Sequence, residues 1–94
     1  MTLESIVVRV ICLIMSVRTM VGKNVRAFRK HTGLGQEEFA SIAGLNRSWL
    51  AAVERGEVNV TIESLERIAA IIGVPVNVLL IEGADKWSQV ARHK

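Results

Sequence analysis

The sequence predicts an all-α fold, in which an apolar N-terminal helix precedes five short helices. Apolar residues recur three and four positions apart along most of the chain, which is the period of a helix and not of a strand. Glycines follow the ends of these segments, and Asn or Thr precedes some of them, as helix caps do. Because no segment alternates clearly between polar and apolar residues, we expect no sheet.

Length and composition indicate one domain with surplus apolar surface. The chain has 94 residues, half of them hydrophobic, which is a high share for a small soluble monomer. We expect the surplus to be buried between subunits. The net charge of +3 permits nucleic acid as a partner without arguing for it, so any positive face must come from the placement of residues.

Cys12 is the single cysteine, which excludes an internal disulfide and favours a cytoplasmic protein. Its apolar neighbours indicate a packed thiol more than a reactive one.

Residues 1–20 are expected to form an apolar helix and to serve as a dimerisation element. Polar residues follow one side of this helix, and a heptad-spaced apolar row follows the other. A signal peptide or membrane span is not expected, because Arg9 and Arg18 interrupt the apolar run. The alternative is an upstream extension without function, with Met15 or Met20 as the natural start. The apolar row consists of Leu3, Val7, Val10, Ile14, Val17 and Val21.

Residues 21–82 are expected to form the five short helices, and residues 83–94 a tail. The expected helices cover residues 22–31, 36–43, 46–55, 62–72 and 75–80. Gly44 supplies a left-handed turn between the second and third of them, and Asn46 and Thr61 are N-caps. The inward set of the fourth is Ile62, Leu65, Ile68, Ala69 and Ile72.

Residues 34–56 form a unit able to place one helix in the major groove of DNA. Two short helices joined by a glycine turn have that shape. The face of the second helix opposite its buried side is small and polar where a charged, solvated face would be ordinary. Arg47 stands at the positive end of this helix, where an acid would be favoured, so a phosphate or a guanine edge would explain it. The residues of that face are Ser48, Ala51, Ala52 and Arg55.

The segment from residue 22 to residue 80 resembles the Cro/repressor-type helix-turn-helix regulators, or XRE family. The resemblance is carried by R-x-x-R, by G-L-x-Q-E-x-x-A, by E-R-G and by T-x-x-x-L-x-x-I-A, all in register. It implies a compact five-helix repressor-like DNA-binding domain, here with an additional N-terminal apolar helix. Within the family, the chain is most similar to the controller proteins of restriction-modification systems.

The resemblance also implies roles for individual residues. Arg29 and Glu54 would form a partly buried salt bridge, in agreement with the position of Glu54 near the buried side of its helix. The residues facing DNA bases would be Arg47, Ser48, Ala51 and Ala52. Those reaching phosphates would be Gln36, Asn46, Arg55, Asn59, Lys23 and Arg26.

Two departures from the family pattern bear on recognition. Gly35 stands where the family usually has a side-chain N-cap, which weakens that cap. Ala51 and Ala52 are too short for bidentate base contacts, so specificity would rest on Arg47, Ser48, thymine methyls and DNA shape.

We therefore expect a homodimeric, sequence-specific transcriptional regulator that binds a palindrome in double-stranded DNA through residues 46–55. The alternative is an antitoxin-like protein-interaction module with secondary DNA binding. An enzyme is not expected, since His31 and His93 are far apart and lack a matching nucleophile or ligand spacing. No cofactor, metal, membrane or small-molecule ligand is expected, the last because no ligand domain follows the helices.

Overall fold

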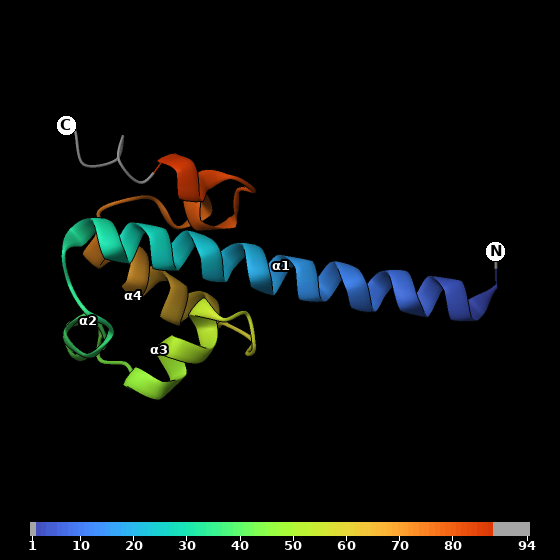
Figure 1. Ribbon diagram of the computed structural model, residues 1–94, viewed down its shortest axis with the longest axis horizontal. Coiled ribbons are helices and arrows are strands. Elements are labelled where there is room, and N and C mark those ends of the chain that lie inside the picture. The colour runs from blue at the N-terminus through green and yellow to red at the C-terminus, as the bar shows by residue number, and fades with distance from the viewer. Residues whose placement is uncertain (1, 88–94) are drawn as a thin grey trace.

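The computed structural model of the chain describes residues 2–87, with the backbone alone for residues 14–16 and 87. Our expectations for Ile14, Met15, His93 and most of the tail lie outside this description. Four α-helices and two short 3-10 helices make up the described part, which contains no strand (Figure 1). Their bounds are α1 Leu3–Thr32, α2 Gln36–Ala43, α3 Arg47–Glu54, α4 Ile62–Ile72, η1 Val76–Leu80 and η2 Ala84–Trp87.

The first helix, α1, is continuous over 30 residues. The N-terminal helix and the basic helix expected from residue 22 are therefore one element without a break at Gly22. The Thr2 hydroxyl begins the helix by accepting a hydrogen bond from the backbone N–H of Ser5 at 3.2 Å. Gly33 ends it in the left-handed conformation, with φ at 84°. Figure 1 shows α1 running the length of the molecule, with its first half extending past all other elements.

The remaining α-helices begin and end close to the expected residues. Asn46 and Thr61 cap α3 and α4, each through a side-chain oxygen that accepts from a backbone N–H three residues later. Gly35 precedes α2 and provides no side-chain cap, as expected. Gly44 ends α2 with φ at 70°, a conformation that favours glycine.

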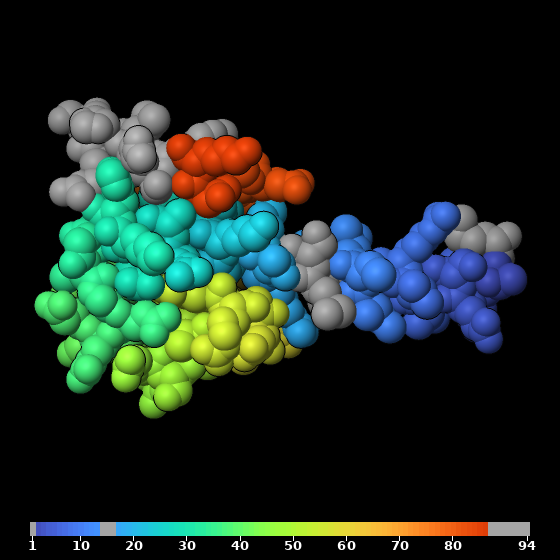
Figure 2. All heavy atoms as spheres, viewed as in Figure 1, coloured from blue at the N-terminus to red at the C-terminus, as the bar shows by residue number. Residues whose placement is uncertain are grey.

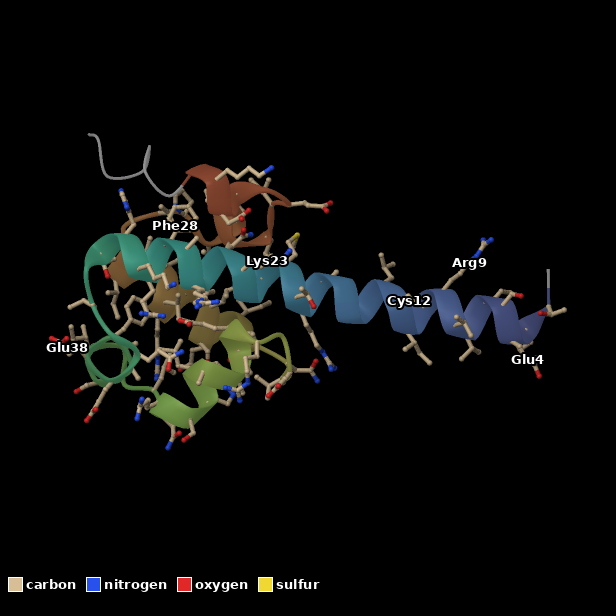
Figure 3. All side chains as sticks on the ribbon, in the orientation of Figure 1. Glu4, Arg9, Cys12, Lys23, Phe28 and Glu38 are labelled. Atoms are coloured by element: carbon tan, nitrogen blue, oxygen red, sulfur yellow. The ribbon has the colours of Figure 1, made fainter. Side chains whose placement is uncertain are left out.

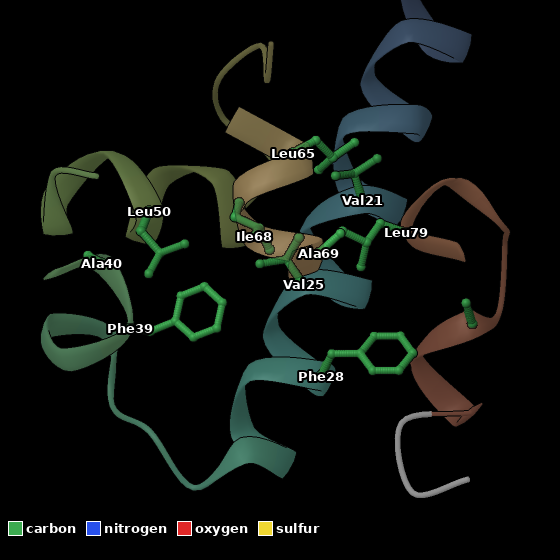
Figure 4. Close-up of a cluster of buried hydrophobic side chains, with 11 residues drawn as sticks. Val21, Val25, Phe28, Phe39, Ala40, Leu50, Leu65, Ile68, Ala69 and Leu79 are labelled. Carbon is green, nitrogen blue, oxygen red and sulfur yellow. The ribbon is translucent and has the colours of Figure 1, made fainter. Parts of the chain in front are cut away.

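The hydrophobic core lies between the second half of α1 and the helices α2 to α4 (Figure 4). Phe28 of α1, Phe39 of α2 and Leu50 of α3 are almost completely buried. Ile68 joins them from α4 and Leu79 from η1. The core therefore contains side chains from every described helix except the first half of α1.

One expected core residue is exposed. Ile62, the first residue of α4, keeps 76% of its surface accessible, whereas Leu65 and Ile68 are buried as expected. The first turn of α4 extends past the core, so helical spacing alone placed Ile62 on the correct side of the helix but at the wrong depth. Its neighbour Val60 packs against the core instead.

The first half of α1 leaves its apolar side chains in solvent. It projects from the rest of the molecule as an isolated rod (Figure 2). Cys12 is exposed there, so the packed thiol expected from its neighbours is not present within one chain. Along this half, the exposed large apolar residues are Leu3, Ile6, Val7, Val8, Val10, Ile11, Leu13 and Val17.

By length and composition alone, α1 could cross a membrane, which the interrupted run in the sequence did not suggest. This is weak evidence, because core helices and signal sequences pass the same test. Only 13% of the apolar window of α1 is buried inside the domain, so burial in a core does not account for its composition.

Candidate nucleic-acid interface

The helices α2 and α3 are joined by a short turn that fixes the angle between them. After Gly44, the backbone N–H of Leu45 donates to the carbonyl of Ala40 at 2.8 Å, closing the end of α2. The Asn46 side chain then accepts from the backbone N–H of Trp49 at 3.2 Å and opens α3. The chain changes direction within three residues, and α3 is left on the surface of the domain (Figure 1).

The outer face of α3 is accessible and made mainly of small side chains. Leu50 and Val53 are buried and hold the helix on the core. Arg47 and Ser48 are exposed at its beginning, while Ala51 and Ala52 are half-buried behind them. Between Arg47 and Arg55, this face has no long side chains that would keep the helix backbone away from a partner.

A buried ion pair attaches the end of α3 to α1. The guanidinium of Arg29 donates to both carboxylate oxygens of Glu54, at 2.6 Å and 3.0 Å. The Glu54 side chain is 3% exposed, so this bidentate pair is shielded from water. Arg29 also donates to the carbonyl of Leu34 at 2.9 Å, which ties the loop before α2 to the same centre.

Gln36 joins this centre from the first turn of α2. Its side-chain amide donates to the Glu54 carboxylate at 3.0 Å. Three elements, α1, α2 and α3, therefore meet through the side chains of Arg29, Gln36 and Glu54. The orientation of α3 depends on this network, and both pairing residues named from the resemblance belong to it.

Gln36 and Arg47 share a shallow hollow between α2 and the beginning of α3. Gly35, Glu37 and Ser41 also line it. With no side chain at Gly35, the beginning of α2 is open toward this hollow. Glu37 and Glu38 both line the hollow and outnumber Arg47, its one cationic lining residue in the described part of the chain, so the charge of the hollow itself does not favour an anion.

Arg55 follows α3 directly and pairs with Glu57 across the turn. Their side chains lie 3.0 Å apart and are both more than half exposed. The hydrogen bond from Arg55 lowers the pKa of Glu57, and the same bond raises the pKa of Arg55. An exposed pair of this kind exchanges partners at small cost, so Arg55 is accessible to a competing anion. Asn59 is exposed in the same loop.

Lys23 does not lie with the other residues assigned to phosphates. It lines a separate hollow with Met20, Glu82 and Lys86, on the side of α1 that carries η2 (Figure 3). The resemblance assigned Lys23 to phosphate contacts from its position in the sequence, but the Lys23 side chain points away from α3. Arg26 is exposed one helical turn after Gly22, which contacts α3, so it stays near that helix.

The sequence analysis missed Gly22, which lets α1 cross α3 closely, and Asn24, which anchors η1 to α1. A Cβ built on Gly22 would lie 2.5 Å from the carbonyl oxygen of Val53 and 2.7 Å from that of Glu54, so only glycine permits this crossing of α1 and α3. Asn24 is fully buried and donates to the carbonyls of Leu79 and Ile81, both at 2.9 Å. A lone Asn among apolar neighbours was the available signal for the second.

A helix-turn-helix with an exposed second helix defines the class of DNA-binding transcriptional regulators. The chain belongs to this family, since the model of the helix-turn-helix domain matches residues 21–80. It is 38% identical over 69 residues to a hypothetical transcription factor of Neisseria meningitidis, covering 73% of this chain and 65% of that protein. The chain thus spans just under two thirds of that relative. It is 39% identical over 75 residues to the control protein C.SmaI of Serratia marcescens, covering 80% of this chain and 89% of that one.

The comparison with solved structures supports the same family. The crystal structure of the hypothetical transcription factor NHTF from Neisseria aligns with a TM-score of 0.69 at 34% identity, over 78% of this chain and 84% of that one. The restriction-modification controller protein C.AhdI from Aeromonas hydrophila aligns with a TM-score of 0.64 at 32% identity, over 66% and 94%. The expected resemblance to XRE-type regulators and controller proteins is confirmed.

Proposed function

We propose that this chain is a sequence-specific transcriptional regulator that acts in the cytoplasm as a homodimer on a palindromic operator. Each subunit would place residues 46–55 in the major groove of one half-site. The observation that carries the proposal is the outer face of α3, where small side chains and Arg47 are exposed while Leu50 and Val53 hold the helix on the core. Successive half-sites would lie about ten base pairs apart.

Base recognition is assigned to the outer face of α3. Arg47 has the length and the hydrogen-bond donors to reach a guanine. The Ser48 hydroxyl can hydrogen-bond to donors or acceptors on base edges. Ala51 and Ala52 can contact thymine methyls, and their small size lets the helix approach the bases. With so few donors, sequence-dependent DNA shape would supply part of the specificity.

Phosphate binding is assigned to residues around α3. Gln36 and Asn46 stand near the two helix beginnings, where anions are favoured, and Arg55 can exchange Glu57 for a phosphate. Arg26 and Asn59 extend this contact on either side. Lys23 has no part in the proposal. We expect these contacts to provide most of the affinity and a steep loss of binding with salt.

The test is a selection of bound sequences from random duplex DNA at two salt concentrations. The wild type should enrich a palindrome, and Arg47→Ala with Ser48→Ala should relax or abolish that enrichment. The matched control is Ser5→Ala with Arg9→Ala, which removes the same charge and hydroxyl from the first half of α1. Salt-sensitive binding without any enriched sequence would contradict sequence-specific recognition.

The exposed first half of α1 favours one other function. An antitoxin-like protein would use such an apolar helix to bind a second protein, with DNA binding as a secondary property. A chain that is monodisperse only with a protein partner would favour this function. A homodimer of the chain alone, with an enriched palindrome, would exclude it as the main activity.

A further inference from the structure

The exposed apolar row of α1 is continuous with the core of the domain. We call this row the α1 seam. Val21, its last residue, is buried, and Phe28, seven residues further on, is buried on the same side of the helix. The seam therefore faces the side of α1 on which the domain packs. Among the residues whose side chains are described, the α1 seam consists of Leu3, Val7, Val10, Val17 and Val21, and the heptad spacing of the sequence adds position 14.

The seam leads into an apolar groove at the edge of the domain. The groove has a volume of about 360 Å³ and lies between α1, the segment before α4, and η1. Arg18 and Asn59 also line the groove. The Nε of Arg18 is shielded from solvent and has no hydrogen-bond partner among the described residues. A shielded, unpaired guanidinium nitrogen beside an open apolar groove indicates a missing acceptor. The apolar lining consists of Leu13, Val17, Val21, Val60, Leu65 and Leu80.

We propose that the α1 seam binds the α1 seam of a second copy of this chain in antiparallel orientation, so that each N-terminus reaches the groove of the other copy. The proposal rests on the homodimer of the proposed function and specifies its interface. In heptad register, Val7 packs against Val17 of the second copy, and Leu3 against Val21 at the inner end of the groove. By symmetry, each contact occurs twice.

Parallel pairing is excluded by the position of the domain itself. In a parallel pair, the second helix would follow the seam past Val17 toward Val21 and Phe28, where α4 and η1 already occupy the space. In an antiparallel pair, the second helix ends at the groove instead. Only the first residues of the second copy's helix would then contact the edge of the domain, which matches the limited size of the groove.

The charges along the seam favour the same orientation. Two charged residues flank the seam, Glu4 and Arg18, and both follow directly after a seam residue, at heptad position e. Antiparallel helices bring the e positions of the two copies to the same edge, which places Glu4 of each copy beside Arg18 of the other. A parallel pair would place Leu13 opposite Arg18. The antiparallel pair thus provides a carboxylate partner for the Arg18 side chain.

The antiparallel pair also places the two DNA-binding helices suitably. Gly22, which contacts the end of α3, is one residue after Val21 and so lies about 100° around the helix from the seam. A two-fold axis perpendicular to both helices then leaves both α3 helices on the same side of the pair. The axis passes near residue 12, so the two Gly22 positions are separated along the helices by about 30 Å, close to one turn of DNA.

Cysteine pairs test the orientation on the full-length chain, in a Cys12→Ser background. Val7→Cys and Val17→Cys are both made at half-exposed positions, together and singly. Under mild oxidation, the double variant should form a covalent dimer, whereas each single variant should not. Dimers from the single variants would show parallel helices, and absence of a dimer in all three would show another occupant; either result overturns the proposal.

A charge exchange tests the pairing without a disulfide. Glu4→Arg and Arg18→Glu should each raise the dimer dissociation constant by about tenfold, because both symmetric ion pairs become repulsive. The double variant should restore it to within about threefold of the wild type, as expected for directly coupled residues. A double variant weaker than either single variant would contradict the pairing. Circular dichroism of each variant checks that the helices are retained.

Three further outcomes separate this interface from a membrane surface and from the proposed function. If the chain stays monomeric and instead floats with phosphatidylcholine and phosphatidylglycerol vesicles, a membrane covers the seam and the proposal fails. If the cysteine and charge variants behave as wild type while a dimeric chain still enriches a palindrome, the proposed function stands and this interface is wrong. An antiparallel dimer that enriches no DNA sequence would leave the interface intact and refute the function.

Discussion

The two halves of α1 share the same helical conformation, but they differ in apolar content, which is higher in the first half, and in what covers them. Val25 and Phe28 in the second half are buried in the core, where α3, α4, η1 and η2 pack on α1, whereas Val8 and Leu13 in the first half stand in solvent. The difference shows that an amphipathic pattern specifies a helix and a face, but not the surface that covers that face. Substitutions in the second half should therefore lower the free energy of unfolding, whereas substitutions in the first half should leave it almost unchanged.

The largest effect is expected from Phe28→Ala. Removing this buried ring leaves a cavity in the core and should lower the free energy of unfolding by about 3–5 kcal/mol. Val8→Ala, in the exposed half and off the seam, should change it by less than about 0.5 kcal/mol. Urea unfolding followed by circular dichroism measures both. Similar losses for the two variants would mean that the first half of α1 is also buried in the domain.

Glu54→Gln is expected to cost about 3 kcal/mol, because it leaves the guanidinium of Arg29 buried without its counter-charge. The matched control is Glu63→Gln, which breaks the exposed pair with Arg67 and should cost less than about 0.5 kcal/mol. Thermal and urea unfolding report these values. Because the ion pair orients α3, operator binding by Glu54→Gln should fall further than its stability alone explains.

Gly22→Ala is expected to destabilise the chain by about 2 kcal/mol, although alanine is the better helix former. The added Cβ would meet the carbonyls of Val53 and Glu54 and push α3 away from α1. Gly35→Ala serves as the control, since nothing lies within 4 Å of its Cβ. A stability gain for Gly22→Ala in urea unfolding would show that the two helices can separate freely.

The smallest effect on unfolding is expected from Val10→Asp in the exposed half. At concentrations where the chain is monomeric, the free energy of unfolding should change by less than about 0.5 kcal/mol. The same substitution places a charge in the α1 seam, and light scattering at high concentration should show the loss of the dimer. A dimer of unchanged mass would locate the interface elsewhere.

Much of the domain follows from local sequence signals. The caps at Asn46 and Thr61 and the glycine at Gly44 set the limits of α2, α3 and α4, because these signals act within a few residues. The pairing of Arg29 with Glu54 came from the resemblance together with the buried position expected for the carboxylate. These features needed no knowledge of the tertiary arrangement.

Other features depend on contacts that local patterns do not carry. Gly22 is required by carbonyls more than 30 residues away in sequence, and its neighbours permit an unbroken helix. The exposure of Ile62 depends on where the core ends, and the direction of Lys23 depends on η2. Helical period predicts a face, but burial depth and the identity of the covering element come from the assembled fold.

The unbroken course of α1 restricts which insertions and deletions the chain can accept. One added residue between Val17 and Gly22 would rotate the first half by about 100° relative to the domain and advance it by about 1.5 Å. Helical propensity would be unaffected, so a change harmless to folding would turn the exposed row away from its covering surface. Homologous chains that keep this extension should therefore differ in length here by about seven residues or not at all.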